Sequence, residues 1–239
     1  MGSGVVVLRE GFEASLVVGI VLAFLDRSGR RDGFSAVWVG VVGALLISAV
    51  VGVALFAVGS ELEGTAEYVF EGMTMILAAA LLVWMIFWMR RQARTIRTDI
   101  EGQVRIALAQ GSAIGLAAVA FVGVLREGIE TALFLLATTE KSSPAVALVS
   151  SLAGLALAIA LGYAFYRGSH RLDLRRFFQV TSGFLLLFAG WLLAGGLEEL
   201  AEGGVIAESE LVLWGAFVAL AAPTLWFFFR PSRPRTPTA

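Results

Sequence analysis

The sequence predicts an all-α protein that crosses a membrane several times, and three observations support this prediction. Of its 239 residues, 58% are hydrophobic, whereas the apolar share of an ordinary soluble domain is roughly 45–50%. Most of the chain falls into apolar runs of about 20 residues, the length that a helix needs to cross a bilayer. The runs are continuous rather than alternating, which argues against a transmembrane β-barrel.

Seven apolar runs are predicted to be transmembrane helices of one domain, 1–230. They cover residues 4–25, 34–59, 68–89, 108–137, 144–166, 177–197 and 211–229. The fourth run is long for one crossing, and Gly111 and Gly115 near its start predict close packing or a bend. The Arg-rich segment before it is predicted to be partly helical. The tail, 231–239, is rich in proline and arginine and is predicted to be disordered.

Lys and Arg indicate the orientation, because the cytoplasmic segments of membrane proteins are enriched in them. Fifteen of the 18 follow the first, third, fifth and seventh spans. Alternate crossings put these segments on one face, predicted to be cytoplasmic, with the N-terminus outside and the C-terminus inside. The outer face is then acidic. We interpret its glutamates either as solubilising loop charges or as an electrostatic funnel for cations.

Two similar charged motifs interrupt the first and fourth apolar runs. Residues 8–16 read LREGFEASL, residues 125–133 read LREGIETAL, and six of the nine positions are identical. Ionisable residues within a membrane are costly and usually functional. The motifs therefore mark the candidate site, with these charged residues: Arg9, Glu10, Glu13, Arg126, Glu127 and Glu130.

The positions of the motifs predict an inverted repeat of three helices, 4–89 against 108–197, with the seventh helix outside it. The first and fourth spans then run in opposite directions. At 1.5 Å per residue, all four motif glutamates would lie roughly 10–15 Å below the outer surface.

The spacing within each motif predicts which side chains meet. Residues three and four apart are neighbours on a helix surface. Arg9 can therefore reach Glu13, while Glu10 and Glu13 point toward the same space. Gly11 and Gly128 leave room for a second backbone or an ion to approach closely.

The motif charges add up to −2, which leaves two interpretations open. The side chains could form a structural network that locks helix packing, although an unpaired charge in a low dielectric is costly. They could instead bind a cation. Carboxylates suit hard ions, and the chain has no Cys and one His, which argues against a site built for Cu(I) or Zn. Fe³⁺, Mn²⁺, Mg²⁺ and Ca²⁺ all remain candidates.

The paired R-E-G-x-E motifs resemble those of the iron permease family, which includes the oxidase-linked permeases of fungi and the bacterial EfeU-type permeases. The resemblance implies inward transport of iron, expected as ferric iron, with Glu10, Glu13, Glu127 and Glu130 as metal ligands. It also implies that the two motif arginines, Arg9 and Arg126, orient or balance these carboxylates. The family usually has leucine at the x position, where this chain has Phe12 and Ile129.

Five further glutamates are candidates for the outer part of the pathway. An inward-facing Glu71, with Glu67 one turn further out, would extend the route from the surface, although both could also be interfacial charges. Glu198, Glu199 and Glu202 are expected in the connection after the sixth span, as a capture site or as loop charges. Trp38, Trp84, Trp88 and Trp226 lie near cytoplasmic span ends, as expected of an aromatic belt.

The predicted protein is a transporter of the cell membrane rather than an enzyme. It needs no prosthetic group, its cargo is an iron ion, and its surroundings are membrane lipid. The family implies a separate protein that oxidises or delivers iron, and a homo-oligomer is also considered. A net charge of −1 gives no reason to expect nucleic acid.

Three alternatives remain beside this prediction. The first is a permease of the same architecture for a divalent ion, Fe²⁺, Mn²⁺ or Pb²⁺. The second is a di-iron membrane oxidase, although such sites typically add E-x-x-H motifs and the chain has none. The third is a membrane scaffold or sensor that transports nothing.

Overall fold

The described part of the chain is helical throughout. The computed structural model describes residues 2–92, 95–139, 144–167 and 174–207, with 214, 215, 217–219, 222 and 226 beyond them. The elements are α1 (Gly2–Arg27), η1 (Arg31–Gly33), α2 (Phe34–Ser60), α3 (Thr65–Gln92), α4 (Ile96–Ala109), α5 (Ala113–Thr139), α6 (Pro144–Tyr166) and α7 (Leu174–Glu202). The all-α prediction is confirmed for these residues. The predicted seventh span, 211–229, lies mostly outside them.

Four segments of the described chain are long and apolar enough to cross a membrane, which supports a multi-pass membrane protein. They are Arg31–Ser60, Thr65–Met89, Ala145–Tyr166 and Phe177–Glu202. The helices α1 and α5 are of similar length, 26 and 27 residues. Each carries its motif charges within the apolar run, which leaves no uncharged stretch of about 20 residues. The count of seven spans stays a prediction.

The predicted fourth span was wrong in its start, because the chain turns within 108–137. The helix α4 ends at Ala109, and Gly111 adopts a φ of +62°, a left-handed conformation that commonly ends helices at glycine. The hydroxyl of Ser112 accepts a 2.9 Å hydrogen bond from the Gly115 N–H and caps α5. The bend predicted near Gly111 is therefore present as a break between two helices, and α5 begins at Ala113.

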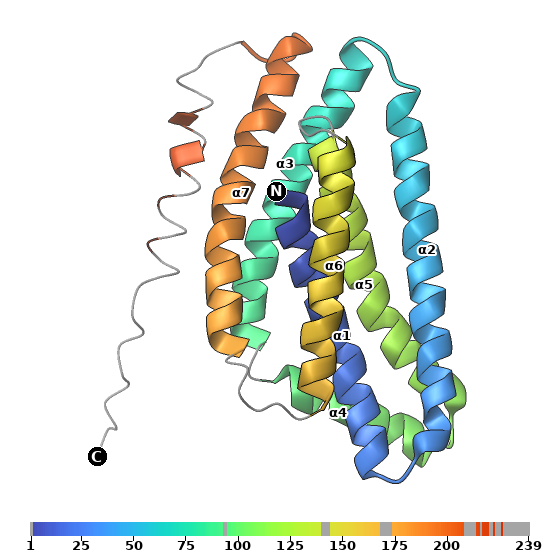
Figure 1. Ribbon diagram of the computed structural model, residues 1–239. Coiled ribbons are helices and arrows are strands. Elements are labelled where there is room, and N and C mark those ends of the chain that lie inside the picture. Colours follow the sequence, from blue (N-terminus) through green and yellow to red (C-terminus); the bar gives the residue numbers. More distant parts are fainter. Residues whose placement is uncertain are drawn as a thin grey trace, which may run out of the picture.

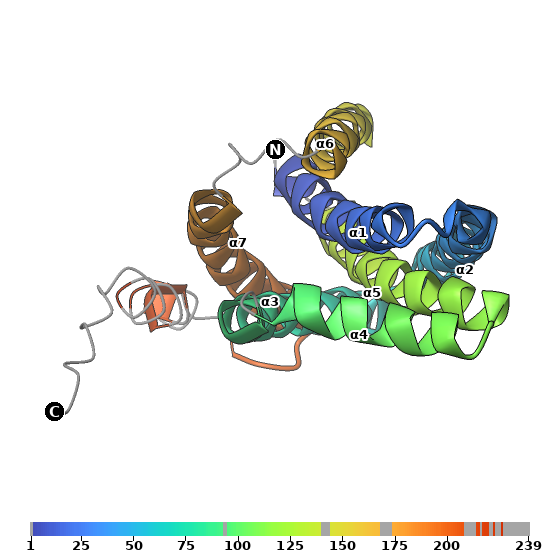
Figure 2. The same cartoon turned by 90° about the horizontal axis from the view of Figure 1, so that it is seen from below.

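The Arg-rich segment before this turn forms the amphipathic helix α4. Its charged residues Arg97, Asp99, Glu101 and Arg105 are not buried, whereas Ile100 and Val104 are. The helix lies across the ends of the long helices (Figures 1 and 2). Its apolar side therefore covers one end of the bundle.

The predicted end of the sixth span, at Leu197, was too early. The helix α7 continues through Glu198 and Glu199 to Glu202, and Gly204 follows with a φ of +73°. Glutamate is a good helix former, so charge alone did not end the helix. The predicted acidic connection is in fact the last turns of α7.

The long helices pack in pairs around a central contact. The helix α1 packs against α6, α2 against α5, and α3 against α7, while α1 and α5 meet in the middle and run in opposite directions (Figure 1). A Cβ at Gly40 of α2 would lie 2.2 Å from the Ala117 carbonyl oxygen of α5, and one at Gly154 of α6 would lie 2.3 Å from that of Gly4. These backbones are close enough that only glycine fits.

An apolar layer fills the contact between α1 and α5 on the side where α4 lies. We use this name for the buried cluster of Val17, Val21 and Leu25 from α1, Ile100 and Val104 from α4, and Leu116, Ala120 and Val124 from α5. Val21, Leu25 and Val104 are completely buried. The layer separates the motif turns from the end of the bundle that α4 covers.

Candidate functional site

Each motif forms the same ion pair along its own helix. The Arg9 Nε donates a 2.9 Å hydrogen bond to Glu13 Oε1, and the Arg126 Nε donates a 3.0 Å hydrogen bond to Glu130 Oε1. Both pairs join residues i and i+4, as the spacing predicts. The sequence similarity between the motifs therefore extends to their side-chain geometry.

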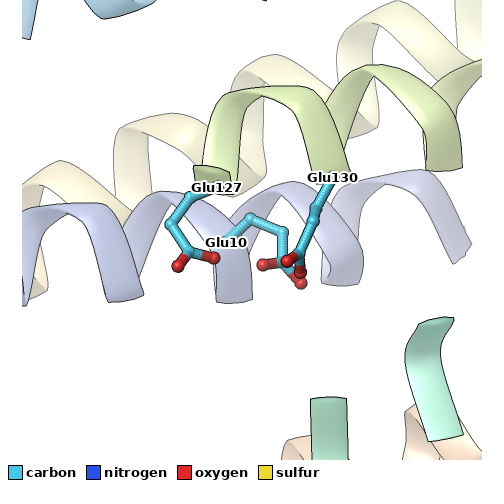
Figure 3. A group of neighbouring side chains, drawn as sticks. All are labelled: Glu10, Glu127 and Glu130. Atoms are coloured by element: carbon cyan, nitrogen blue, oxygen red, sulfur yellow. The ribbon is translucent and has the colours of Figure 1, made fainter. Parts of the chain in front are cut away.

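Contact between α1 and α5 brings three glutamates of the two motifs together. Glu10, Glu127 and Glu130 each place a carboxylate oxygen within 4.8 Å of the others. In Figure 3, Glu127 and Glu130 come from one turn of α5, Glu10 comes from α1, and the three carboxylates lie on the same side. We call these three residues the glutamate triad. Converging carboxylate oxygens suit a hard cation.

Burial makes this arrangement costly unless something balances its charge. Glu10 is completely buried, and Glu127 and Glu130 are 7% and 8% exposed. Both oxygens of Glu10 and the Oε2 atoms of Glu127 and Glu130 have no hydrogen-bond partner within the described residues. Buried polar atoms are normally satisfied. The unsatisfied oxygens of the triad are therefore chemically suited to ligate a cation.

The fourth motif glutamate, Glu13, lies outside the triad. It is 5% exposed and bonded to Arg9, which is completely buried. The Nη1 and Nη2 atoms of Arg9 have no hydrogen-bond partner in the part of the chain that the structure describes. Of the four predicted ligands, the structure therefore groups three and pairs the fourth with an arginine.

Neighbouring helices fill the space beside the motif glycines. A Cβ at Gly11 would lie 3.0 Å from the Ala158 Cβ of α6, and one at Gly128 would lie 2.2 Å from the Ser48 Oγ of α2. The approach of another helix, one of the two predicted uses for this room, is present at both glycines. The glycines therefore hold the motif turns against α2 and α6.

Two tryptophans contact the site, which the sequence did not indicate. The Arg126 Cζ lies 4.0 Å from the ring centroid of Trp88 and 5.7 Å from that of Trp84, both on α3. Both tryptophans were predicted to belong to an aromatic belt. Their spacing of four residues does predict a shared helix face, but no sequence signal shows that this face meets α5.

The structure brings together only two of the five predicted pathway residues. Glu67 and Glu71 are half-buried and line a pocket of about 120 Å³ between α2, α3 and α5. Its α5 wall, Leu136 and Ala137, lies about 10 Å along the helix from Glu130. At the end of α7, Glu199 is buried while Glu198 and Glu202 are exposed, and none of the three lines this pocket.

Comparison with known proteins identifies the family. Residues 1–215 match the profile of the "Iron permease FTR1 family". The chain belongs to this family. Its resemblance to iron permeases is therefore confirmed over most of its length.

Curated relatives include three proteins named "Ferrous iron permease EfeU". Those of Yersinia pestis and Yersinia pseudotuberculosis are each 35% identical to this chain over 218 residues, which is 90% of this chain and 74% of theirs. That of Escherichia coli O6:H1 is 34% identical over the same length, or 76% of its own chain. No solved structure matches the chain.

Proposed function

We propose that this protein is an iron permease of the cell membrane that carries iron inward through the glutamate triad. The observation that carries the proposal is the buried triad itself, whose unsatisfied oxygens come from both motifs. Membership of the iron permease family supports iron as the cargo. Glu13, with the two motif arginines, would complete the charge balance around the ion.

The helix pairing supports the proposed inverted repeat of α1–α3 against α5–α7. Exchanging the two halves turns the α1–α6 contact into the α5–α2 contact, and leaves the α1–α5 and α3–α7 contacts unchanged. This is the pattern expected of two halves related by a two-fold axis. The distribution of Lys and Arg supports the orientation proposed above, with the end covered by α4 in the cytoplasm.

The net charge of the motif side chains bears on the oxidation state of the transported iron. Four glutamates and two arginines sum to −2 when ionised, and a divalent ion balances this sum without a proton. The relatives are named ferrous iron permeases. The ferric ion expected from the sequence remains a proposal, and these two observations make Fe²⁺ the first form to test.

The route from the outer surface is proposed to begin at the pocket that Glu67 and Glu71 line. Negative charge there would raise the local concentration of cations. Glu198, Glu199 and Glu202 at the outer end of α7 would add to the same field. A separate protein that oxidises or delivers iron remains the proposed partner, and a homo-oligomer also remains proposed.

The experiment that tests the function is radio-iron uptake into proteoliposomes, with Fe²⁺ and Fe³⁺ supplied separately and Mn²⁺ as competitor. We expect the Glu13→Gln, Glu130→Gln double variant to lose uptake. Because these changes also break both arginine pairs, Glu10→Gln, which leaves the pairs intact, is measured beside it and should lose uptake while remaining folded. The matched control is Glu101→Gln on α4, which breaks a 2.9 Å Arg97–Glu101 pair of the same spacing at the surface and should transport normally.

Each alternative predicts a different result in this assay. Competition by Mn²⁺ at concentrations equal to iron would indicate a broader divalent permease. Stable di-iron with oxygen consumption would indicate an oxidase. Equal uptake by the wild type and the double variant would indicate that the motifs form a structural network and do not bind the transported ion.

A further inference from the structure

The two motif arginines occupy equivalent sequence positions but differ in their surroundings. The side chain of Arg9 is completely buried, whereas that of Arg126 is 30% exposed. The Arg126 guanidinium lies over the face of Trp88 at 4.0 Å. No comparable ring contact with Arg9 is found among the described residues. The two halves of the site are therefore inequivalent.

Arg126 lies beside the triad rather than among its oxygens. Its Nε is 3.0 Å from Glu130 Oε1 and 4.0 Å from Glu127 Oε1. A guanidinium has five N–H donors, and bidentate pairing with carboxylates is its preferred geometry. The Arg126 Nη2 atom is nevertheless buried without a partner in the described structure. Something other than the carboxylates therefore keeps this end of the guanidinium in place.

The ring of Trp88 is the group positioned to do so. A cation over an indole face is attracted by the negative charge of the ring system. Trp84 stacks on Trp88, with ring centroids 6.0 Å apart and planes at 21°, which stabilises the orientation of the ring. The tryptophan pair thus holds the guanidinium on the α3 side of the triad.

We propose that Trp88 is a positioning residue that keeps Arg126 from occupying the cation site. With the guanidinium held by the ring, the Oε2 atoms of Glu127 and Glu130 remain available to iron. Without the ring, Arg126 turns further into the triad, pairs with these Oε2 atoms and competes with the cargo. This inference rests on the proposed function, because it assigns the triad to iron.

The test measures uptake kinetics in proteoliposomes with radio-iron supplied as Fe²⁺ or Fe³⁺, whichever form the wild type transports. We expect Trp88→Leu to raise KM for iron by about 2- to 30-fold, the range that a cation–π contact covers, with the maximal rate unchanged. Trp88→Phe, which keeps an aromatic face, should restore KM to near the wild-type value. Trp38→Leu removes an exposed tryptophan of α2 and is the matched control.

A double-mutant cycle separates positioning from general damage. In the Arg126→Gln background, which has no guanidinium to restrain, Trp88→Leu should cause no further rise in KM. Should Trp88→Leu fail to fold, Trp88→Met replaces it in the same cycle. An unchanged KM in the leucine or methionine variant, or an equal rise in the Arg126→Gln background, overturns the inference.

The result also distinguishes this inference from the proposed function. If the Glu13→Gln, Glu130→Gln variant loses uptake but Trp88→Leu keeps the wild-type KM, only the positioning role is wrong. If the glutamate variant transports normally, the triad is not the transport site, and the proposed function is wrong.

Discussion

Replacing Gly128 by alanine should damage the site much more than the same change at Gly11, although both glycines hold the same motif position. At Gly128 the new Cβ would lie 2.2 Å from the Ser48 Oγ and 2.7 Å from the Ser48 Cβ. Ordinary contacts between carbon atoms are about 3.5–4.0 Å. The helices α2 and α5 would therefore have to separate by roughly 1 Å. Overpacking of this kind typically lowers the free energy of unfolding by about 1–3 kcal/mol.

The change at Gly11 is milder because the nearest atom, the Ala158 Cβ, is 3.0 Å away. A shift of a few tenths of an ångström relieves this contact. Alanine also stabilises a helix by about 1 kcal/mol relative to glycine. The two effects nearly cancel, so Gly11→Ala should leave stability close to that of the wild type.

Iron uptake should be more sensitive than protein stability to the displacement that Gly128→Ala causes. Gly128 lies between Glu127 and Glu130, so moving this turn moves two of the three triad carboxylates. A misplacement of about 1 Å can reduce a rate by about 100-fold. We expect Gly128→Ala to lower iron uptake in proteoliposomes and to lower the melting temperature of the protein in detergent.

A compensating variant makes this prediction refutable. Ser48→Gly removes both atoms that the Gly128→Ala methyl group would strike, and the Ser48 hydroxyl has no hydrogen-bond partner in the described structure to lose. The double variant should recover much of the lost uptake. If Gly128→Ala matches Gly11→Ala, or if Ser48→Gly restores nothing, the close contact of α2 and α5 does not position the triad.

Three further outcomes are expected. Arg9→Gln leaves Glu13 buried and unpaired and should lower the free energy of unfolding by about 3–5 kcal/mol. Arg97→Gln at the surface should lower it by about 0–1 kcal/mol. Thermal unfolding in detergent compares the two variants, and equal losses of stability would contradict the buried pairing. Iron uptake at low iron should fall as external pH is lowered, because protons compete for carboxylate oxygens; a pH profile in which the apparent KM stays constant would argue against carboxylate ligands. In the same unfolding measurement, Leu25→Ala in the apolar layer should lower the free energy of unfolding by about 2–5 kcal/mol. Leu46→Ala on the exposed side of α2 should change it little.

The parts of the site that depend on one helix could be predicted from the sequence. The pairing of Arg9 with Glu13 follows from a spacing of four residues, and it is present in both motifs. Which glutamates gather across α1 and α5 depends on how those helices approach each other. No sequence pattern places Glu10 with Glu127 and Glu130 while leaving Glu13 outside the triad.

The errors of prediction have equally specific causes. Charge was taken to end the sixth span, but Glu198 and Glu199 are compatible with a helix that stops only near Gly204. Trp88 was assigned to the membrane interface because it lies near the end of its span, and its contact with Arg126, 38 residues away in the sequence, was missed. Contacts of this kind depend on tertiary packing, which a single sequence does not encode in readable form.

The apolar layer has a consequence for the kind of transport that this fold permits. Between Glu13 and Asp26, α1 carries no ionisable side chain, a distance of about 20 Å along the helix. The facing side chains of α4 and α5 in the layer are also apolar. An ion leaving the glutamates toward α4 would find no carboxylate among the side chains of this layer, so those helices would have to separate for it to pass. A permease that works as proposed would therefore move its cargo by a cycle of conformations, one ion binding event at a time, and helix motion rather than diffusion through an open pore would limit its turnover.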